Sequence, residues 1–239
     1  YHMVSYNGLL KRISKDYFLT IKEKRIFQSE FEELAIIPKK VLRIFENYDS
    51  IELLKNYQKN GMGYSLFRFS DKKYFDYMII EYLLVGIELK ILDGYLFSTG
   101  SWFSEELKTI KIIKDENSAE SFDEGYGLYS IRKAIRNNKF DKAIEAYQSI
   151  PNEIKKKEAF EIINLYLISK LEGREFEDRV LQFNIDFPNK KNYSLYLSIL
   201  RYHTFKNCDR LEKSVLEFST HVFKDSLLMK LINDCAIKI

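Results

Sequence analysis

The sequence predicts an α+β N-terminal domain, with helices and a three-stranded antiparallel meander, followed by an all-α stack of helical hairpins. Aromatic and apolar residues alternate with polar ones between residues 64 and 98, as they do in strands. After residue 127 this alternation is missing, and a spacing of bulky residues recurs every 35 or 36 positions. An acidic stretch with Ser, Asn and Gly separates the two patterns. We therefore expect two domains, residues 4–114 and residues 115–239.

Composition indicates an ordinary globular chain. Its 239 residues are 46% hydrophobic and 31% charged, and 38 Lys and Arg face 35 Asp and Glu, for a net charge of +3. Charge alone therefore gives no reason to expect a nucleic-acid partner. No apolar run reaches the roughly 18 residues of a spanning helix, so we expect no membrane span. A chain of this length buries a core that needs no disulfide.

The first quarter of the chain predicts short helices. Apolar residues recur at helical spacing from residue 9 to residue 60. Pro38 suits the first turn of one helix, and Asp49 or Ser50 suits the N-cap of another. Gly61 and Gly63 end this pattern.

The meander is expected to begin at Tyr64. Residues 70–73 form the first turn and Val85-Gly86 the second, so that the third strand covers residues 87–98. Gly94 lies too close to the end of that strand for another hairpin, and we expect a β-bulge there.

The C-terminal repeat is defined by a triplet with the spacing 0, 3, 7. A polar turn and an earlier helix precede each triplet, so each unit is predicted to be helix, turn, helix. Pro151 and Pro188 follow the first two units, where a ring without an N–H ends a helix. The three triplets are Phe140-Ala143-Tyr147, Phe176-Arg179-Phe183 and Leu211-Ser214-Phe218.

The run from Asn138 to Tyr147, closed by Ile150-Pro151-Asn152, resembles the second helix of a tetratricopeptide repeat. Ala143 stands where that family has a small residue and Tyr147 where it has a large one; the later units carry Arg179 and Ser214 at the small position. The resemblance covers about residues 120–239 and implies a partner-binding role. The N-terminal half is similar, in layout only, to the cystatin-like and nuclear-transport-factor-like cones.

Catalytic and metal-binding patterns are missing from the sequence, and we expect no catalytic, cofactor-binding or metal-ligating residue and no cofactor. The turn Gly100-Ser101-Trp102 lacks the second glycine of a nucleophile elbow, so Ser101 or Ser104 is interpreted as the N-cap of a helix over 105–111. Cys208 and Cys235 are interpreted as buried small side chains. No two histidines have a spacing that would share a metal on one helix face.

Clustered charges are interpreted as solvated surface. The acidic pairs diverge on helices or linkers, which disfavours acid–base chemistry. The lysine runs flank helix ends beside several glutamates, which disfavours nucleic-acid binding. These clusters are Glu32-Glu33, Asp115-Glu116, Asp123-Glu124, Lys155 to Lys157 and Lys190-Lys191.

The leading functional expectation is a non-enzymatic interaction or scaffold protein that binds a peptide or helix of another protein through its helical repeats. The alternative is small-ligand binding or hydrolysis in a pocket of the N-terminal domain, with Asp76, Glu81 or Asp93 as its polar groups. Sheet aromatics are expected to form core more often than pocket. The compartment is either the cytoplasm or, where an export signal has been removed, the periplasm.

Overall fold

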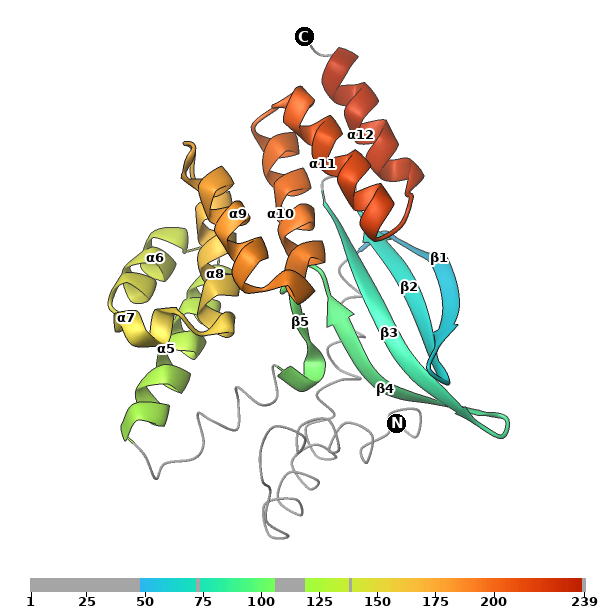
Figure 1. The fold of residues 1–239 in the computed structure, drawn as a ribbon, viewed down its shortest axis with the longest axis horizontal. Helices are drawn as coiled ribbons and strands as arrows, with labels where there is room; N and C mark the ends of the chain where they lie inside the picture. The colour runs from blue at the N-terminus through green and yellow to red at the C-terminus, as the bar shows by residue number, and fades with distance from the viewer. Residues whose placement is uncertain (1–47, 72–73, 106–118, 138, 238–239) are drawn as a thin grey trace, which may run out of the picture. The chain divides into compact units, whose positions relative to one another are not determined.

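The computed structural model describes residues 48–71, 74–105, 119–137 and 139–237, shown in colour in Figure 1. These residues divide into two compact units. A sheet unit holds the described residues up to Phe97 together with 101–105, and a helical unit holds Ser98–Gly100 and everything described from Ala119 onward. The predicted helices of residues 9–47 and the boundary stretch 106–118 lie outside the described residues.

The sheet unit is an antiparallel meander of five described strands in sequence order (Figure 1). The expected three-stranded meander is therefore too small. Strands were missed at both edges, β1 before the predicted meander and the two-residue β5 after it. The strands are β1 (Ser50–Lys59), β2 (Met62–Ser70), β3 (Phe75–Val85), β4 (Glu88–Leu96) and β5 (Ser101–Trp102).

Strand β1 replaces the predicted helix that was to begin at Asp49 or Ser50, and that prediction is wrong. The chain reverses at Asn60-Gly61, where both residues have positive φ, 53° and 77°. This is the pair that a type I′ hairpin turn prefers, because both central residues must adopt left-handed backbone. The pairing register also shifts between Leu53 and Lys55, so a bulge interrupts the alternation that would have indicated a strand.

The two inner turns lie where the sequence predicts them. Asp71 accepts a hydrogen bond from the Tyr74 N–H at 2.6 Å, and Gly86 turns the chain between β3 and β4 with a φ of 63°. The bulge of β4 is displaced from its predicted place. Glu81 pairs with Asp93 and Tyr82 with Ile91, which leaves Leu92 as the extra residue.

Buried aromatic side chains form the core of the sheet unit. The Tyr77 ring meets Phe75 and Phe97 edge-on, with centroids 5.7 Å away in each case, and Tyr95 meets Phe97 at 5.2 Å. These four residues and Phe69 are buried, whereas Tyr74 is 68% exposed. The interpretation of these buried aromatics as core is confirmed.

The helical unit contains three helix pairs in its described part, α5 with α6, α8 with α9 and α10 with α11, and a last helix, α12, that packs on α11. Figure 1 shows these pairs following one another along the chain. The elements are α5 (Ala119–Arg136), α6 (Phe140–Gln148), α7 (Asn152–Lys155), α8 (Glu158–Ser169), α9 (Glu175–Asp186), the 3-10 turn η1 (Pro188–Lys190), α10 (Lys191–Thr204), α11 (Cys208–His221) and α12 (Ser226–Ile237). An α+β region followed by a helical region is thus confirmed; a tetratricopeptide-like stack and the domain boundaries stay predictions.

The three triplets of the sequence repeat lie on the second helix of each pair, α6, α9 and α11. Ala143 is completely buried in a cluster with Leu128, Ile131 and Phe160. At the equivalent position of α9, Arg179 forms an ion pair with Glu161 of α8. A polar side chain at this small-residue position is thus neutralised by the first helix of its own pair.

Cys208 and Cys235 form a disulfide, with Cα atoms 5.7 Å apart. This overturns the interpretation of the two cysteines as separate buried side chains. The disulfide joins the start of α11 to the last turn of α12 across 27 positions of the sequence. It therefore closes the last helical hairpin.

Among the described residues, no helix is both long enough and apolar enough to cross a bilayer.

Candidate functional site

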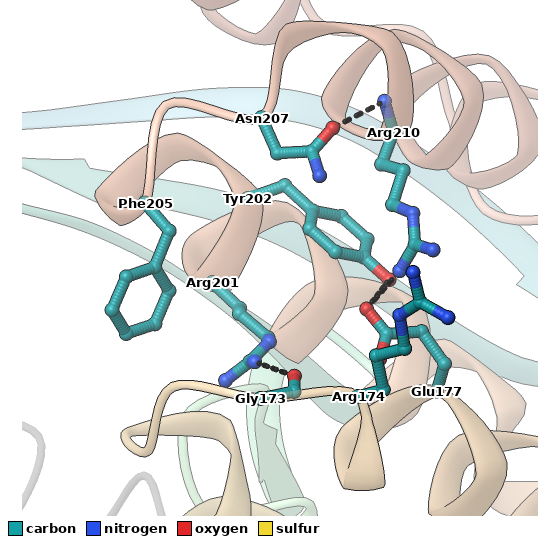
Figure 2. A pocket seen from close by; sticks show the side chains of 8 residues that line it. All are labelled: Gly173, Arg174, Glu177, Arg201, Tyr202, Phe205, Asn207 and Arg210. Atoms are coloured by element: carbon teal, nitrogen blue, oxygen red, sulfur yellow. Dashed lines mark hydrogen bonds and ion pairs between the residues drawn. The ribbon is translucent and has the colours of Figure 1, made fainter.

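A cavity of about 310 Å³ lies where three helix ends of the helical unit meet (Figure 2). The turn before α9 and the first turn of α9 form one wall, and the end of α10 with the start of α11 forms the other. Arginine, aromatic and amide side chains dominate the lining. The lining residues are Gly173, Arg174, Glu177, Arg201, Tyr202, Phe205, Asn207 and Arg210, and we call this the arginine pocket.

Arg201 is the buried arginine of this pocket, with 6% of its surface exposed. Its guanidinium donates to the carbonyls of Ile168, Ser169 and Leu171, and to that of Gly173 at 2.7 Å. The first two carbonyls belong to the last turn of α8, where the helix has no internal donors for them and carries partial negative charge. Arg201 therefore caps α8.

Two aromatic rings enclose the same guanidinium. Its central carbon lies 4.9 Å from the ring centroids of both Phe176 and Phe205. Stacking on an aromatic face favours the planar guanidinium, and the rings exclude water from its hydrogen bonds. No carboxylate among the described residues pairs with Arg201, so carbonyl dipoles rather than an anion balance its charge.

Glu177, Arg210 and Tyr202 form the opposite corner of the pocket (Figure 2). The Glu177 carboxylate pairs with the Arg210 guanidinium, and its Oε1 accepts a hydrogen bond from the Tyr202 hydroxyl at 3.3 Å. Burial first, and then the Glu177 charge, raise the pKa of Tyr202, so this hydroxyl stays a donor at neutral pH. The single negative charge of Glu177 thus neutralises Arg210 and no other arginine of the pocket.

Arg174 lines the same cavity and is exposed. Throughout the part of the chain that the structure describes, its guanidinium has neither an ion pair nor a hydrogen bond. The Asn207 oxygen accepts from the Arg210 backbone N–H at 3.3 Å, which leaves the amide nitrogen of Asn207 as a donor at the pocket. These two groups are the free donors of the site.

The charges of the lining do not balance. Three arginines face one glutamate, so the pocket carries a formal surplus of +2. Of the two arginines without an acidic partner among the described residues, Arg201 is held by carbonyls and Arg174 makes no such bond. A planar guanidinium with free donors is suited to a carboxylate or phosphate group, which accepts its hydrogen bonds.

The carboxylates named for the alternative function lie in the sheet unit. Asp76, Glu81 and Asp93 are all buried, and Glu81 and Asp93 face each other as partners on β3 and β4. Asp93 accepts hydrogen bonds from the Ser104 hydroxyl at 2.5 Å and the Gly94 N–H at 2.8 Å. Asp76 accepts a hydrogen bond from the Tyr77 N–H at 2.8 Å and stands five positions from Glu81 along β3.

The predicted N-caps are wrong. Ser101 pairs with Leu96 as part of β5, and Ser104 lies inside the helical residues 103–105. Instead, the Glu105 carboxylate accepts a hydrogen bond from the Trp102 N–H at 2.9 Å. A carboxylate in the first turn thus satisfies a backbone N–H at the start of the helix.

Three lysines of the predicted solvated runs form ion pairs or hydrogen bonds within the protein. Lys190 is only 4% exposed; its Nζ lies 3.1 Å from Glu158 and donates to the Gly100 carbonyl. Lys191 pairs with Glu217 at 2.9 Å, and Lys155 donates to the Gln148 carbonyl at 2.9 Å.

Within the described residues no group of His, Cys, Asp and Glu could hold a metal ion.

Comparison with known proteins returns no match, since no family model, curated protein or solved structure is significantly similar to the chain.

Sequence reasoning missed the pocket, although one signal was available. Residues 193–202 are aliphatic, tyrosine or serine except for Arg201, which is the sole charge in that run. A charge on a helix face that is otherwise apolar requires a partner, which marks the residue for inspection. Arg174 and Arg210 carry no such signal, because both are exposed arginines at helix starts.

Proposed function

We propose that this chain is a non-enzymatic interaction protein that binds a peptide or helix of a partner through its helical unit. The arginine pocket is the anchor, and it takes an acidic side chain or a chain-terminal carboxylate of that partner. The observation that carries the proposal is the uncompensated guanidinium of Arg174 beside a cavity with a surplus of positive charge.

The construction of the pocket supports a binding role. Arg201, Tyr202 and Glu177 are fixed by hydrogen bonds within the helical unit, so little conformational freedom is lost there when a ligand arrives. Arg174 and the Asn207 amide are the groups that a ligand would engage. Fixed walls with a few free donors are typical of sites that recognise one small polar group.

Peptide display against the full chain tests this proposal. We expect recovered peptides to be enriched in Asp, Glu or a free C-terminal carboxylate, and to bind with micromolar affinity that falls with salt. The variant Arg174→Ala should weaken these peptides at least about tenfold, because a charge-assisted bond contributes about 1.5 to 3 kcal/mol.

The matched control removes the same charge elsewhere in the helical unit. Lys142 is exposed and outside the pocket, so Lys142→Ala should leave peptide affinity unchanged. Peptides without acidic groups, or equal losses in Arg174→Ala and Lys142→Ala, would contradict the anchor role of the pocket.

The disulfide bears on where this binding takes place. Disulfides persist in oxidising compartments and are rare in the cytosol. The bond between Cys208 and Cys235 therefore favours the periplasm over the cytoplasm for the proposed interaction.

A second candidate function is ligand binding or hydrolysis in the sheet unit. One observation favours it: Glu81 and Asp93 are buried opposite each other, and carboxylate pairs of this kind serve acid–base chemistry. The conservative variant Glu81→Gln in a panel of ester, glycoside and phosphoester substrates tests it. Hydrolysis by the parent chain that is lost in this variant would establish an enzyme and displace the interaction proposal for this unit.

A further inference from the structure

The hairpin of β3 and β4 extends beyond its neighbours. The last pair that joins β2 to β3 is Gly63 with Tyr82, so Leu83, Leu84 and Val85 pair only with β4. The hairpin accordingly projects past the turn between β1 and β2, as Figure 1 shows at the lower right. We call residues 83–90 the hairpin tip.

This tip is apolar and exposed. Leu84 is 57% exposed, Val85 56% and Ile87 102%. Exposed turns normally carry polar residues, and three large aliphatic side chains within four positions depart from that rule. None of the three serves the core of the sheet unit.

The shape of the tip decides what can cover it. Leu84 pairs with Leu89 and Val85 with Glu88, so these aliphatic side chains lie on opposite faces of the ribbon. Ile87 stands at the end, in the turn beside Gly86. A flat partner would cover only one face of such a projection, whereas a fluid apolar layer surrounds all of it.

Lysine side chains lie behind the hairpin tip. Lys59 is exposed at the end of β1, and Lys90 lies at the base of the tip opposite Leu83. Glu88 is the one acidic residue of the tip, and it is paired with Lys90 at 2.7 Å. Two lysines against one glutamate leave a net positive charge at this end of the sheet, which is complementary to anionic lipid headgroups.

Tyrosines form the next layer. Tyr57 stacks on Tyr64 across β1 and β2, with ring centroids 5.2 Å apart, and Tyr82 donates to Asn56 at 2.8 Å. Tyrosine side chains gather at the boundary between headgroups and water, where one end of the ring is apolar and the other is wet. The order along the hairpin is thus tyrosines, lysines and aliphatic tip.

We propose that the hairpin tip inserts into the surface layer of a bilayer that contains anionic lipid. Ile87, Leu84 and Val85 enter the boundary of the acyl chains, while Lys59 and Lys90 contact headgroups. Three residues of strand beyond the lysine layer span about 10 Å, which matches the depth of interfacial segments. This contact would hold the chain at the membrane surface through the hairpin tip.

Vesicle co-sedimentation of the full chain tests this proposal. We expect binding to vesicles of phosphatidylcholine with one third phosphatidylglycerol, and at least about tenfold weaker partitioning into pure phosphatidylcholine. Ile87→Asp should weaken binding to the mixed vesicles by at least about tenfold, since the variant replaces an isoleucine that gains from leaving water with a charged side chain that does not.

A matched variant separates the tip from general hydrophobicity. Ile185 on α9 is 72% exposed, and Ile185→Asp makes the same chemical change at a helix of the other unit. It should leave vesicle binding unchanged, and thermal unfolding of both variants should match that of the parent chain. Lys59→Gln should lower binding about fivefold, in the anionic vesicles only.

Three results would overturn the proposal. The first is absence of binding to the mixed vesicles by a folded parent chain. The second is an equal loss for Ile87→Asp and Ile185→Asp. The third is a parent chain that self-associates through the tip, so that Ile87→Asp produces monomers while vesicle binding stays unaltered, which would make a second copy the occupant.

Discussion

The arginine pocket and the hairpin tip differ in how their residues relate to the fold. In the pocket, Arg201 caps a helix and Glu177 neutralises Arg210, so most lining side chains stabilise the helical unit as well as shape the cavity. At the tip, Leu84 and Ile87 contact little and are left in water. One surface is made of structural residues, and the other is made of residues that the sheet does not use.

This difference has consequences for mutational analysis. Substitutions in the pocket change stability and binding together, except at Arg174, which has no partner within the described residues. Substitutions at the tip should change vesicle binding and leave the free energy of unfolding unchanged. The loss of stability on removing an aliphatic side chain depends on how deeply it is buried, and the tip side chains are exposed. The following predictions are ordered by the size of the expected effect on unfolding.

Removing the disulfide should have the largest effect. The double variant Cys208→Ser/Cys235→Ser frees a loop of 27 positions, and chain entropy predicts a loss of about 3 to 4 kcal/mol from the free energy of unfolding. Thermal unfolding with and without reductant measures it. The parent chain should respond to reductant and the double variant should not; a parent melt that reductant leaves unchanged would contradict the structural role of this bond.

The variant Arg201→Met should lower the free energy of unfolding by about 2 to 4 kcal/mol. Methionine fills the space between Phe176 and Phe205 but cannot donate to the four carbonyls that the guanidinium satisfies. Denaturant unfolding measures the loss. The control Arg174→Met should stay within about 0.5 kcal/mol of the parent chain; equal effects of the two variants would refute the distinction between structural and free arginines.

The variant Ala143→Leu tests the close helix contact that the repeat pattern predicts. Ala143 is completely buried between α5, α6 and α8, so three added carbons should cost about 1 to 3 kcal/mol. The control Glu145→Leu, on an exposed position of the same helix, should be nearly neutral. Because the pocket belongs to other helix pairs, peptide binding at low temperature should survive Ala143→Leu.

The sequence predicted the helix pairs because their signal is local and repeated. The triplet with spacing 0, 3, 7 recurs where the core face of each second helix lies, and the prolines after the first two units mark real helix ends. The first edge strand was missed because a bulge between Leu53 and Lys55 places apolar residues side by side, as a helix also does. The pair Asn60-Gly61 was a hairpin signal that the helical interpretation overlooked.

The arginine pocket and the disulfide were not predictable in the same way. Both depend on which helix ends meet in space, and sequence spacing does not encode that. Cys208 and Cys235 have no diagnostic separation, and only the antiparallel packing of α11 and α12 brings them together. Glu177 and Arg210 likewise come from two successive helix pairs and stand 33 positions apart in the sequence.

The smallest effect on stability is expected at the hairpin tip. Leu84→Ser should change the free energy of unfolding by no more than about 0.5 kcal/mol, because the side chain is already in water when the chain is folded. Leu66→Ser, the same change at a leucine of β2 with 3% exposure, should cost about 3 kcal/mol or more. Denaturant unfolding of the two variants measures the contrast. A large loss for Leu84→Ser would mean that the tip is packed in solution and would remove the basis for membrane insertion. A neutral Leu84→Ser that also weakens vesicle binding would show that an aliphatic residue is present at the tip for contact outside the fold.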